Sequence, residues 1–203
     1  IHLNDSLKKF LLKKKIWCAS STHDSEEIFC GLVHKKLKKK YKNLLTIIIP
    51  RHIDRTDSIK NELRKLNLKI YIHESKLKLK NNTDIYIVNA YGKTKSFYNY
   101  CKNVFLGGSL INHGGQNPLE AARYGCNIFH GPYTHNFTEI YKFLKKNNIS
   151  QKINNENQIA NFLVRYFSKR PNSKFIQKKL NFIGQKILEN TYKEVKLLLK
   201  NEI

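Results

Sequence analysis

The stretch from Asn103 to Glu139 constrains the fold most, because it alternates short apolar runs with glycine-rich turns. Residues 103–106 have the composition of a short buried strand, and the glycine pair Gly107-Gly108 follows directly. A second glycine pair opens a helix, and residues 127–130 form another apolar run. The order strand, loop, helix, strand and helix is typical of an α/β domain with a parallel sheet.

The helix signals within this stretch predict where a ligand would bind. Asn117 suits a helix cap, Pro118 suits the first helical position, and Gly125 suits the helix end. A further helix is expected from about Asn136. Glycines after a strand let a ligand approach the backbone, and the N–H groups at a helix start favour an anion such as phosphate. The alternative is a tight turn without a ligand, because the spacing matches neither the dinucleotide fingerprint nor the P-loop.

The remainder of the chain repeats the alternation of strand and helix. Residues 44–49 are almost continuously apolar, as expected for a parallel strand buried on both faces. The expected strands are 16–20, 44–49, 69–73, 84–88, 103–106 and 127–130. Helices are expected from the Ser21–Glu27 segment to Lys40, and over 55–66, 94–101, 157–167 and 173–199. The sequence therefore predicts a doubly wound, Rossmann-like parallel sheet with a helical C-terminal tail.

Composition limits the classes of partner. The chain has 203 residues and a net charge of +23, and most of its 38 basic residues are lysines spread over many segments. This pattern speaks against nucleic acid as the partner and leaves an anionic lipid surface or a solvated lysine-rich surface. The four cysteines form no C-x-x-C pair and lie mostly in apolar runs, which is typical of reduced, buried cysteines in a cytosolic protein. Neither a membrane span, a signal peptide nor a metal site is predicted.

Polar residues follow the predicted strands, where ligands of such folds bind. Ser21 and Thr22 carry hydroxyls for a phosphate or sugar acid, or else serve as helix caps. Arg51 follows a strand, and its guanidinium fork matches a phosphate or a carboxylate. Glu120 can accept hydrogen bonds from ribose hydroxyls or simply complement the helix dipole. The remaining residues expected at this rim are His23, His52, His113, Asn117, Asn136 and Glu139.

Four motifs, in this order, resemble the 3-deoxy-D-manno-octulosonic acid (Kdo) transferases and, more distantly, the donor-binding half of GT-B glycosyltransferases. The motifs are Ser21-Thr22-His23 with Glu26-Glu27, Pro50-Arg51-His52 with Arg55, the run from Gly107 to Glu120, and the run from Gly131 to Ile140. Together they cover roughly residues 17–144. One departure is Gly92-Lys93-Thr94, where the family has Gly-Glu-Leu.

The resemblance implies a metal-independent glycosyltransferase that transfers Kdo from CMP-Kdo to a lipid A precursor in lipopolysaccharide biosynthesis. It implies no cofactor besides this donor substrate, and it places the enzyme at the cytoplasmic face of the inner membrane. The implied donor contacts are Ser21, Thr22, Arg51, Tyr91, Gly92, Gly107, Gly108, Ser109, Asn117 and Glu120, with His23, Asn136 and Glu139 near the sugar acid. The catalytic carboxylate would come from an N-terminal acceptor domain and not from this chain, which alone would bind donor without turnover.

The expected division of the chain is a linker over residues 1–15, a donor-binding domain over 16–170 and a C-terminal helix over 171–203. This helix would pack towards the acceptor domain and leave an apolar face between Phe175 and Leu199 partly exposed. Two alternatives remain open at this point. The first is another GT-B enzyme such as a nucleotide-sugar epimerase, and the second is a non-catalytic basic module that binds membrane or nucleic acid.

Overall fold

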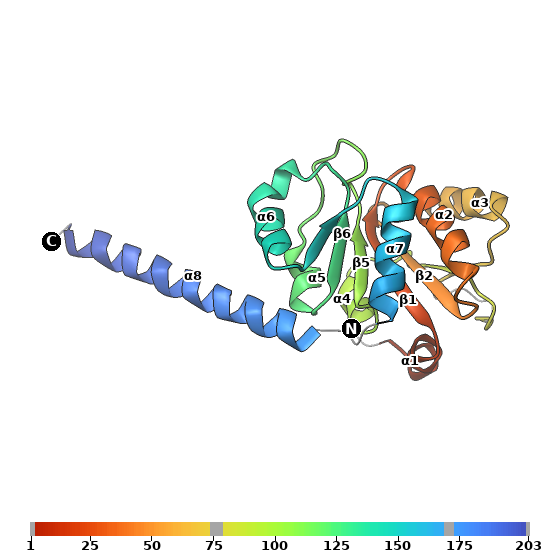
Figure 1. Ribbon diagram of the computed structural model, residues 1–203, viewed down its shortest axis with the longest axis horizontal. Helices are drawn as coiled ribbons and strands as arrows, with labels where there is room; N and C mark the ends of the chain where they lie inside the picture. Colours follow the sequence, from red (N-terminus) through yellow and green to blue (C-terminus); the bar gives the residue numbers. More distant parts are fainter. Residues whose placement is uncertain (1–2, 74–78, 169–172, 202–203) are drawn as a thin grey trace.

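The fold is a seven-stranded parallel sheet with helices on both faces (Figure 1). This computed structural model describes residues 3–73, 79–168 and 173–201. The strands are β1 Lys15–Thr22, β2 Leu44–Pro50, β3 Ile70–Ile72, β4 Ile85–Ile87, β5 Asn103–Leu106, β6 Asn127–His130 and β7 Ser150–Lys152. The helices are α1 Asp5–Leu12, α2 Glu26–Lys38, η1 Ile53–Arg55, α3 Thr56–Lys65, α4 Thr94–Tyr98, α5 Leu119–Arg123, η2 His135–Phe137, α6 Thr138–Lys146, α7 Glu156–Phe167 and α8 Ser173–Asn201.

The strand order is β3-β4-β2-β1-β5-β6-β7, and every neighbouring pair is parallel. β1 is central, with β2 to β4 on one side and β5 to β7 on the other. The direction in which the chain adds strands therefore reverses between β1 and β5. In doubly wound sheets, ligands bind outside the carboxyl ends of the strands at such a reversal. The topology thus directs attention to the loops after β1 and β5.

The core has two layers because successive side chains of a strand point to opposite faces. Trp17, Ala19 and Phe105 pack on one face with apolar side chains from α2, α3 and α7. Cys18 and Val104 pack on the other face with side chains from α1, α4, α5, α6 and the start of α8. Both layers consist mainly of buried side chains, so the sheet holds its loops on a rigid frame.

The predicted parallel α/β fold is confirmed, and each of the six predicted strands is present. The third strand is shorter than the predicted 69–73, and the helix predicted over 94–101 ends at Tyr98. β7 was not predicted. Its sequence Ser150-Gln151-Lys152 is polar, and it is a strand because its backbone pairs with β6. A polar edge strand of this kind leaves no hydrophobic pattern in the sequence.

α1 lies within the predicted linker and packs on the domain. Asn4 caps it by accepting a hydrogen bond from the Leu7 N–H at 2.8 Å. Leu7 is 5% exposed and Leu11 is fully buried. The described part of the lead-in therefore contributes to the core, and the domain limits themselves stay a prediction.

α8 extends away from the sheet and its covering helices (Figure 1). Ile176 is buried near its start, whereas Phe182 and Leu188 are 66% and 70% exposed. Phe175 is exposed as well. The sequence predicts exposed apolar side chains in this segment, and these residues are among them. Among the described residues, no helix combines the length and apolar character needed to cross a bilayer.

Candidate functional site

Four loops meet at the carboxyl edge of the sheet. Register pairs Ser20 with Leu106, and Leu106 with His130, so β5 and β6 end at the same level and β1 continues beyond it to Thr22. The ends of β1 and β2 are also joined, because the Arg51 N–H donates to the Thr22 carbonyl at 2.9 Å. The loops after β1, β2, β5 and β6 therefore converge beside the strand reversal, where the fold predicts a ligand site.

The loop after β5 is held by a carboxylate from α2. Glu26 accepts hydrogen bonds from the backbone N–H groups of Gly108 at 2.7 Å, Ser109 at 3.1 Å and Leu110 at 3.0 Å. It also accepts from the His23 N–H at 3.0 Å. The residue is only 1% exposed. Burial raises the pKa of Glu26, and these four backbone N–H groups oppose that rise. Glu26 thus joins the turn after β1 to the loop after β5.

The loop after β6 is fastened to the loop after β5. The Ser109 hydroxyl donates to the Leu106 carbonyl at 2.5 Å and accepts from the Gly131 N–H at 2.8 Å. The Asn136 side chain donates to the His113 carbonyl at 3.2 Å. Ser109 is fully buried, so its hydroxyl connects the two loops from inside. These bonds fix the loop after β6 relative to the glycine loop, defined here as Gly107 to Leu110.

Three histidines form an imidazole rim, defined here as His23, His52 and His113. The His23 ring lies 4.2 Å from that of His113 and 5.7 Å from that of His52, measured between ring centres. Gln116 reaches the same place, with its side-chain nitrogen 3.4 Å from His23 Nε2. Burial, together with the neighbouring histidines and arginines, lowers the pKa of His23 to about 4. A neutral imidazole still carries one N–H donor, so the rim can donate hydrogen bonds to an anionic ligand.

Most of the predicted site residues lie in these four loops or at the strand end that leads into one of them. They are Ser21, Thr22, His23, Arg51, Gly107, Gly108, Ser109, Asn117 and Asn136. Thr22 and Ser109 are fully buried, whereas Arg51 is exposed. Asn117 does not begin the helix as predicted, since α5 starts at Leu119, but its side chain accepts from the Leu119 N–H at 3.0 Å. Donor contact by each of these residues stays a prediction.

Four other predicted residues lie outside this group. Tyr91 and Gly92 are on the exposed turn after β4, which is two strands away from β1. Glu120 forms an ion pair with Lys95 of α4 at 3.5 Å. Glu139 lies on α6 and bonds to Lys142 at 2.8 Å. The contacts that these carboxylates make in the structure are therefore with lysines of the surface.

Neither Glu26 nor Glu27 was predicted from the sequence to have a role in the site, although both belong to the first of the four motifs. Glu27 is fully buried and accepts from Arg55 at 3.1 Å. Arg55 also pairs with Asp24 at 2.7 Å. The one sequence signal for such a role was the position of Glu26 and Glu27, because two consecutive glutamates follow the turn after the central strand β1. Gln116 was also missed, because a single half-buried glutamine in a loop carries no sequence pattern.

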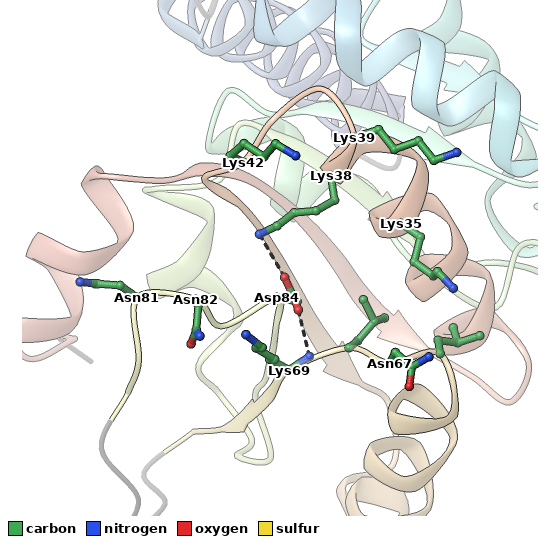
Figure 2. Close-up of a pocket in the computed structure, with 11 residues that line it drawn as sticks. Lys35, Lys38, Lys39, Lys42, Asn67, Lys69, Asn81, Asn82 and Asp84 are labelled. Atoms are coloured by element: carbon green, nitrogen blue, oxygen red, sulfur yellow. Dashed lines mark hydrogen bonds and ion pairs between the residues drawn. The ribbon is translucent and has the colours of Figure 1, made fainter.

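A lysine-lined cleft lies at the opposite edge of the sheet (Figure 2). It has a volume of about 670 Å³, and its basic side chains are Lys35, Lys38, Lys39, Lys42 and Lys69. Asp84 in its wall bonds to Lys38 at 3.0 Å and to the Lys69 N–H at 2.9 Å, as the dashed lines in Figure 2 show. Burial alone would raise the pKa of Asp84, but His34, Lys69 and Lys38 hold it well below its usual range. The cleft therefore presents positive charge.

Buried histidines predict a loss of stability in mild acid. His130 ends β6, where its Nδ1 lies 2.8 Å from the Gly131 carbonyl oxygen, and burial lowers its pKa from 6.5 to about 4. The unfolded chain then binds the proton first, so stability falls as pH drops from about 6.5 towards 4, by up to roughly 3 kcal/mol for this residue. Thermal unfolding at several pH values should show a flatter pH dependence for His130→Phe. The exposed His135→Asn should leave the wild-type dependence unchanged, and equal slopes in all three proteins would contradict this assignment.

Comparisons with known proteins agree with this architecture. No family model matches the chain. It is 33% identical over 186 residues to the 3-deoxy-D-manno-octulosonic acid transferase of Haemophilus influenzae, covering 91% of this chain and 43% of the relative. It is 28% identical over 177 residues to the protein of the same name from Aquifex aeolicus, covering 87% and 49%. The chain thus spans about half the length of the curated relatives it matches.

A solved structure gives the same fold. The C-terminal CMP-Kdo binding domain of WaaA from Acinetobacter baumannii superposes with a TM-score of 0.79 at 21% identity, covering 88% of this chain and 93% of that domain. Sequence similarity over most of the chain and the shared fold lead to one conclusion. The chain is a homologue of the 3-deoxy-D-manno-octulosonic acid transferases and has the fold of a C-terminal, Rossmann-like GT-B domain.

Proposed function

We propose that this chain is the donor-binding half of a Kdo transferase, which transfers Kdo from CMP-Kdo to a lipid A precursor in lipopolysaccharide biosynthesis. The observation that carries the proposal is the 33% identity to a protein named for this transfer, which extends over 91% of the chain. The name of the similar WaaA domain, CMP-Kdo binding, supports the donor. The four converging loops supply the polar groups that a nucleotide sugar requires.

The proposed reaction is a direct displacement at the anomeric carbon of Kdo. A base removes the proton of the acceptor hydroxyl, the oxygen attacks, and CMP leaves with the electron pair of the broken bond. Arg51 stabilises the charge on the leaving phosphate. The base belongs to the acceptor-binding part of the full-length enzyme, so the chain alone binds donor and does not turn it over.

Calorimetric titration with CMP tests the proposal, with UMP and AMP as controls. Selective binding of CMP is expected. Equal binding of all three nucleotides would instead indicate a generic phosphate site, and a different nucleotide preference would favour another GT-B enzyme. Binding to DNA or liposomes without any nucleotide preference would support the non-catalytic alternative.

We further propose that the protein works at an anionic membrane surface, the cytoplasmic face of the inner membrane. The net charge of +23 and the lysine-lined cleft in Figure 2 support this location. Lys39 and Lys42 are exposed at this cleft. The lysines described above as bonded to Asp84 are Lys38 and Lys69, so changing Lys39 and Lys42 leaves those bonds in place. The double change Lys39→Glu and Lys42→Glu should weaken binding to phosphatidylglycerol vesicles by about tenfold or more, since each basic residue contributes about 1 kcal/mol near such a surface.

The control for this experiment makes the same change of charge elsewhere. Lys145 and Lys146 are exposed at the end of α6, and changing both to Glu should reduce vesicle binding less. Vesicles of neutral phosphatidylcholine should bind none of the proteins measurably. Equal losses in the two double variants would show that net charge, and not the cleft, governs binding.

A further inference from the structure

The glycine loop of the site already holds an anion that belongs to the protein. The two carboxylate oxygens of Glu26 accept from four backbone N–H groups, two for each oxygen. Three of these groups, those of Gly108, Ser109 and Leu110, are consecutive. Consecutive N–H groups of this kind are the usual means by which a loop binds a phosphate. In this loop they point inward to the side chain of Glu26.

The geometry also defines the charge of Glu26. All four partners are donors, and a protonated carboxyl would have to place its own hydrogen against one of them. The carboxylate form is therefore the one that satisfies every partner. Its neighbour Glu27 shows that this is not a general property of the helix start, because Glu27 is equally buried but pairs with the Arg55 side chain.

The side chains that we assign to a ligand lie next to the three N–H groups held by Glu26. The imidazole rim stands directly over Gly108, where a methyl group would come within 3.0 Å of His113 and 3.3 Å of His23. Gln116 approaches the rim, and Arg51 follows β2 beside it in the same set of loops. His23 is itself tied to Glu26 through its backbone N–H. The carboxylate therefore sets the position of the rim as well as that of the glycine loop.

We propose that Glu26 is the positioning residue of the donor site, that its carboxylate is the resident anion of the glycine loop, and that the anionic groups of the donor bind the imidazole rim with Arg51. This inference rests on the proposed donor-binding function. It assigns binding roles to His52 and His113 and gives Gly108 and Ser109 a structural role in place of a direct phosphate contact. The ligand class is an anionic sugar nucleotide whose phosphate and carboxylate are met by side chains.

Amide NMR spectra of the free protein test the first part without any donor. In Glu26→Gln, the amide signals of Gly108, Ser109 and Leu110 should move upfield and exchange with solvent at least about tenfold faster, because an amide group cannot accept from four donors. Glu26→Asp retains the charge and should restore part of the shift. Glu27→Gln removes an equally buried carboxylate and should leave these three signals in place. Unchanged signals in Glu26→Gln would overturn the assignment.

Titration of the same proteins with CMP tests the second part. In the wild-type chain, CMP should change the imidazole signals of His23 and His113 and leave the three loop amides nearly unmoved. Glu26→Gln should weaken CMP binding at least about tenfold, with partial recovery in Glu26→Asp. Large shifts of the loop amides on adding CMP would show that phosphate displaces Glu26. This result would contradict the proposal that the donor binds the imidazole rim. If the wild-type chain binds no CMP, both the proposed function and the proposed binding at the imidazole rim are wrong. The amide spectra of Glu26→Gln then still decide whether Glu26 holds the glycine loop.

Discussion

Gly107→Ala is expected to lower the free energy of unfolding by about 3 kcal/mol or more. A Cβ atom on Gly107 would lie 2.3 Å from the Ser21 carbonyl oxygen and 2.6 Å from the Thr22 Cα. It would also lie 2.7 Å from a carboxylate oxygen of Glu26. Two of these three contacts are with the backbone of a central strand, which cannot rotate away. Either β1 and β5 separate or Glu26 leaves the glycine loop, and both outcomes cost stability.

Denaturant unfolding measures this effect, and Gly184→Ala is the matched control. Gly184 lies in α8 with no atom within 4 Å of an added Cβ. Alanine there should stabilise the helix by roughly 0.5–1 kcal/mol, because glycine loses more conformational freedom in a helix. The same substitution should therefore have opposite signs at the two positions. A Gly107→Ala protein within about 0.5 kcal/mol of wild type would contradict the close packing of the loop on β1.

Most of the predicted strands could be identified from the sequence because each is an apolar run that is buried on both faces, whereas β3 is only partly buried. Residues 44–49 are the clearest case, and they form most of β2. β7 could not be identified, since its polar residues form a strand only through pairing with β6. Local pattern thus predicts those elements that bury their own side chains, and it fails where a neighbouring strand supplies the reason for the structure.

Local sequence pattern also predicts only part of the candidate site. Glycine pairs and turn residues after strands indicated which loops form the site, because loop position follows from the parallel sheet. The role of Glu26 could not be predicted, because its partners Gly108 to Leu110 come more than 80 residues later in the chain. An acidic residue in a first helical turn is usually explained by the helix dipole. Only the tertiary structure shows that this one is surrounded by backbone donors.

Arg51→Ala is expected to weaken binding of CMP at the proposed donor site by about tenfold to a hundredfold. A hydrogen-bonded charge pair between a guanidinium and a phosphate contributes about 1.5–3 kcal/mol, which corresponds to that range. Arg51 is exposed at the end of β2, and its N–H is bound to the Thr22 carbonyl at 2.9 Å. The alanine keeps that backbone bond, so the fold should change little and the loss should appear in affinity. Calorimetry with CMP measures the difference.

Arg64→Ala is the control that distinguishes loss of the guanidinium–phosphate contact from loss of one positive charge. Arg64 is exposed in the last turn of α3, and its removal changes the net charge by the same amount. Affinity for CMP should stay within about twofold of wild type, because charges separated by more than a Debye length are screened. Arg51→Lys should fall between the two, since lysine keeps the charge but loses the bidentate fork. Equal affinities of Arg51→Ala and Arg64→Ala for CMP would place the phosphate elsewhere in the site. A small loss in Arg51→Lys and a larger loss in Arg51→Ala would identify the Arg51 side chain as the direct partner of the phosphate.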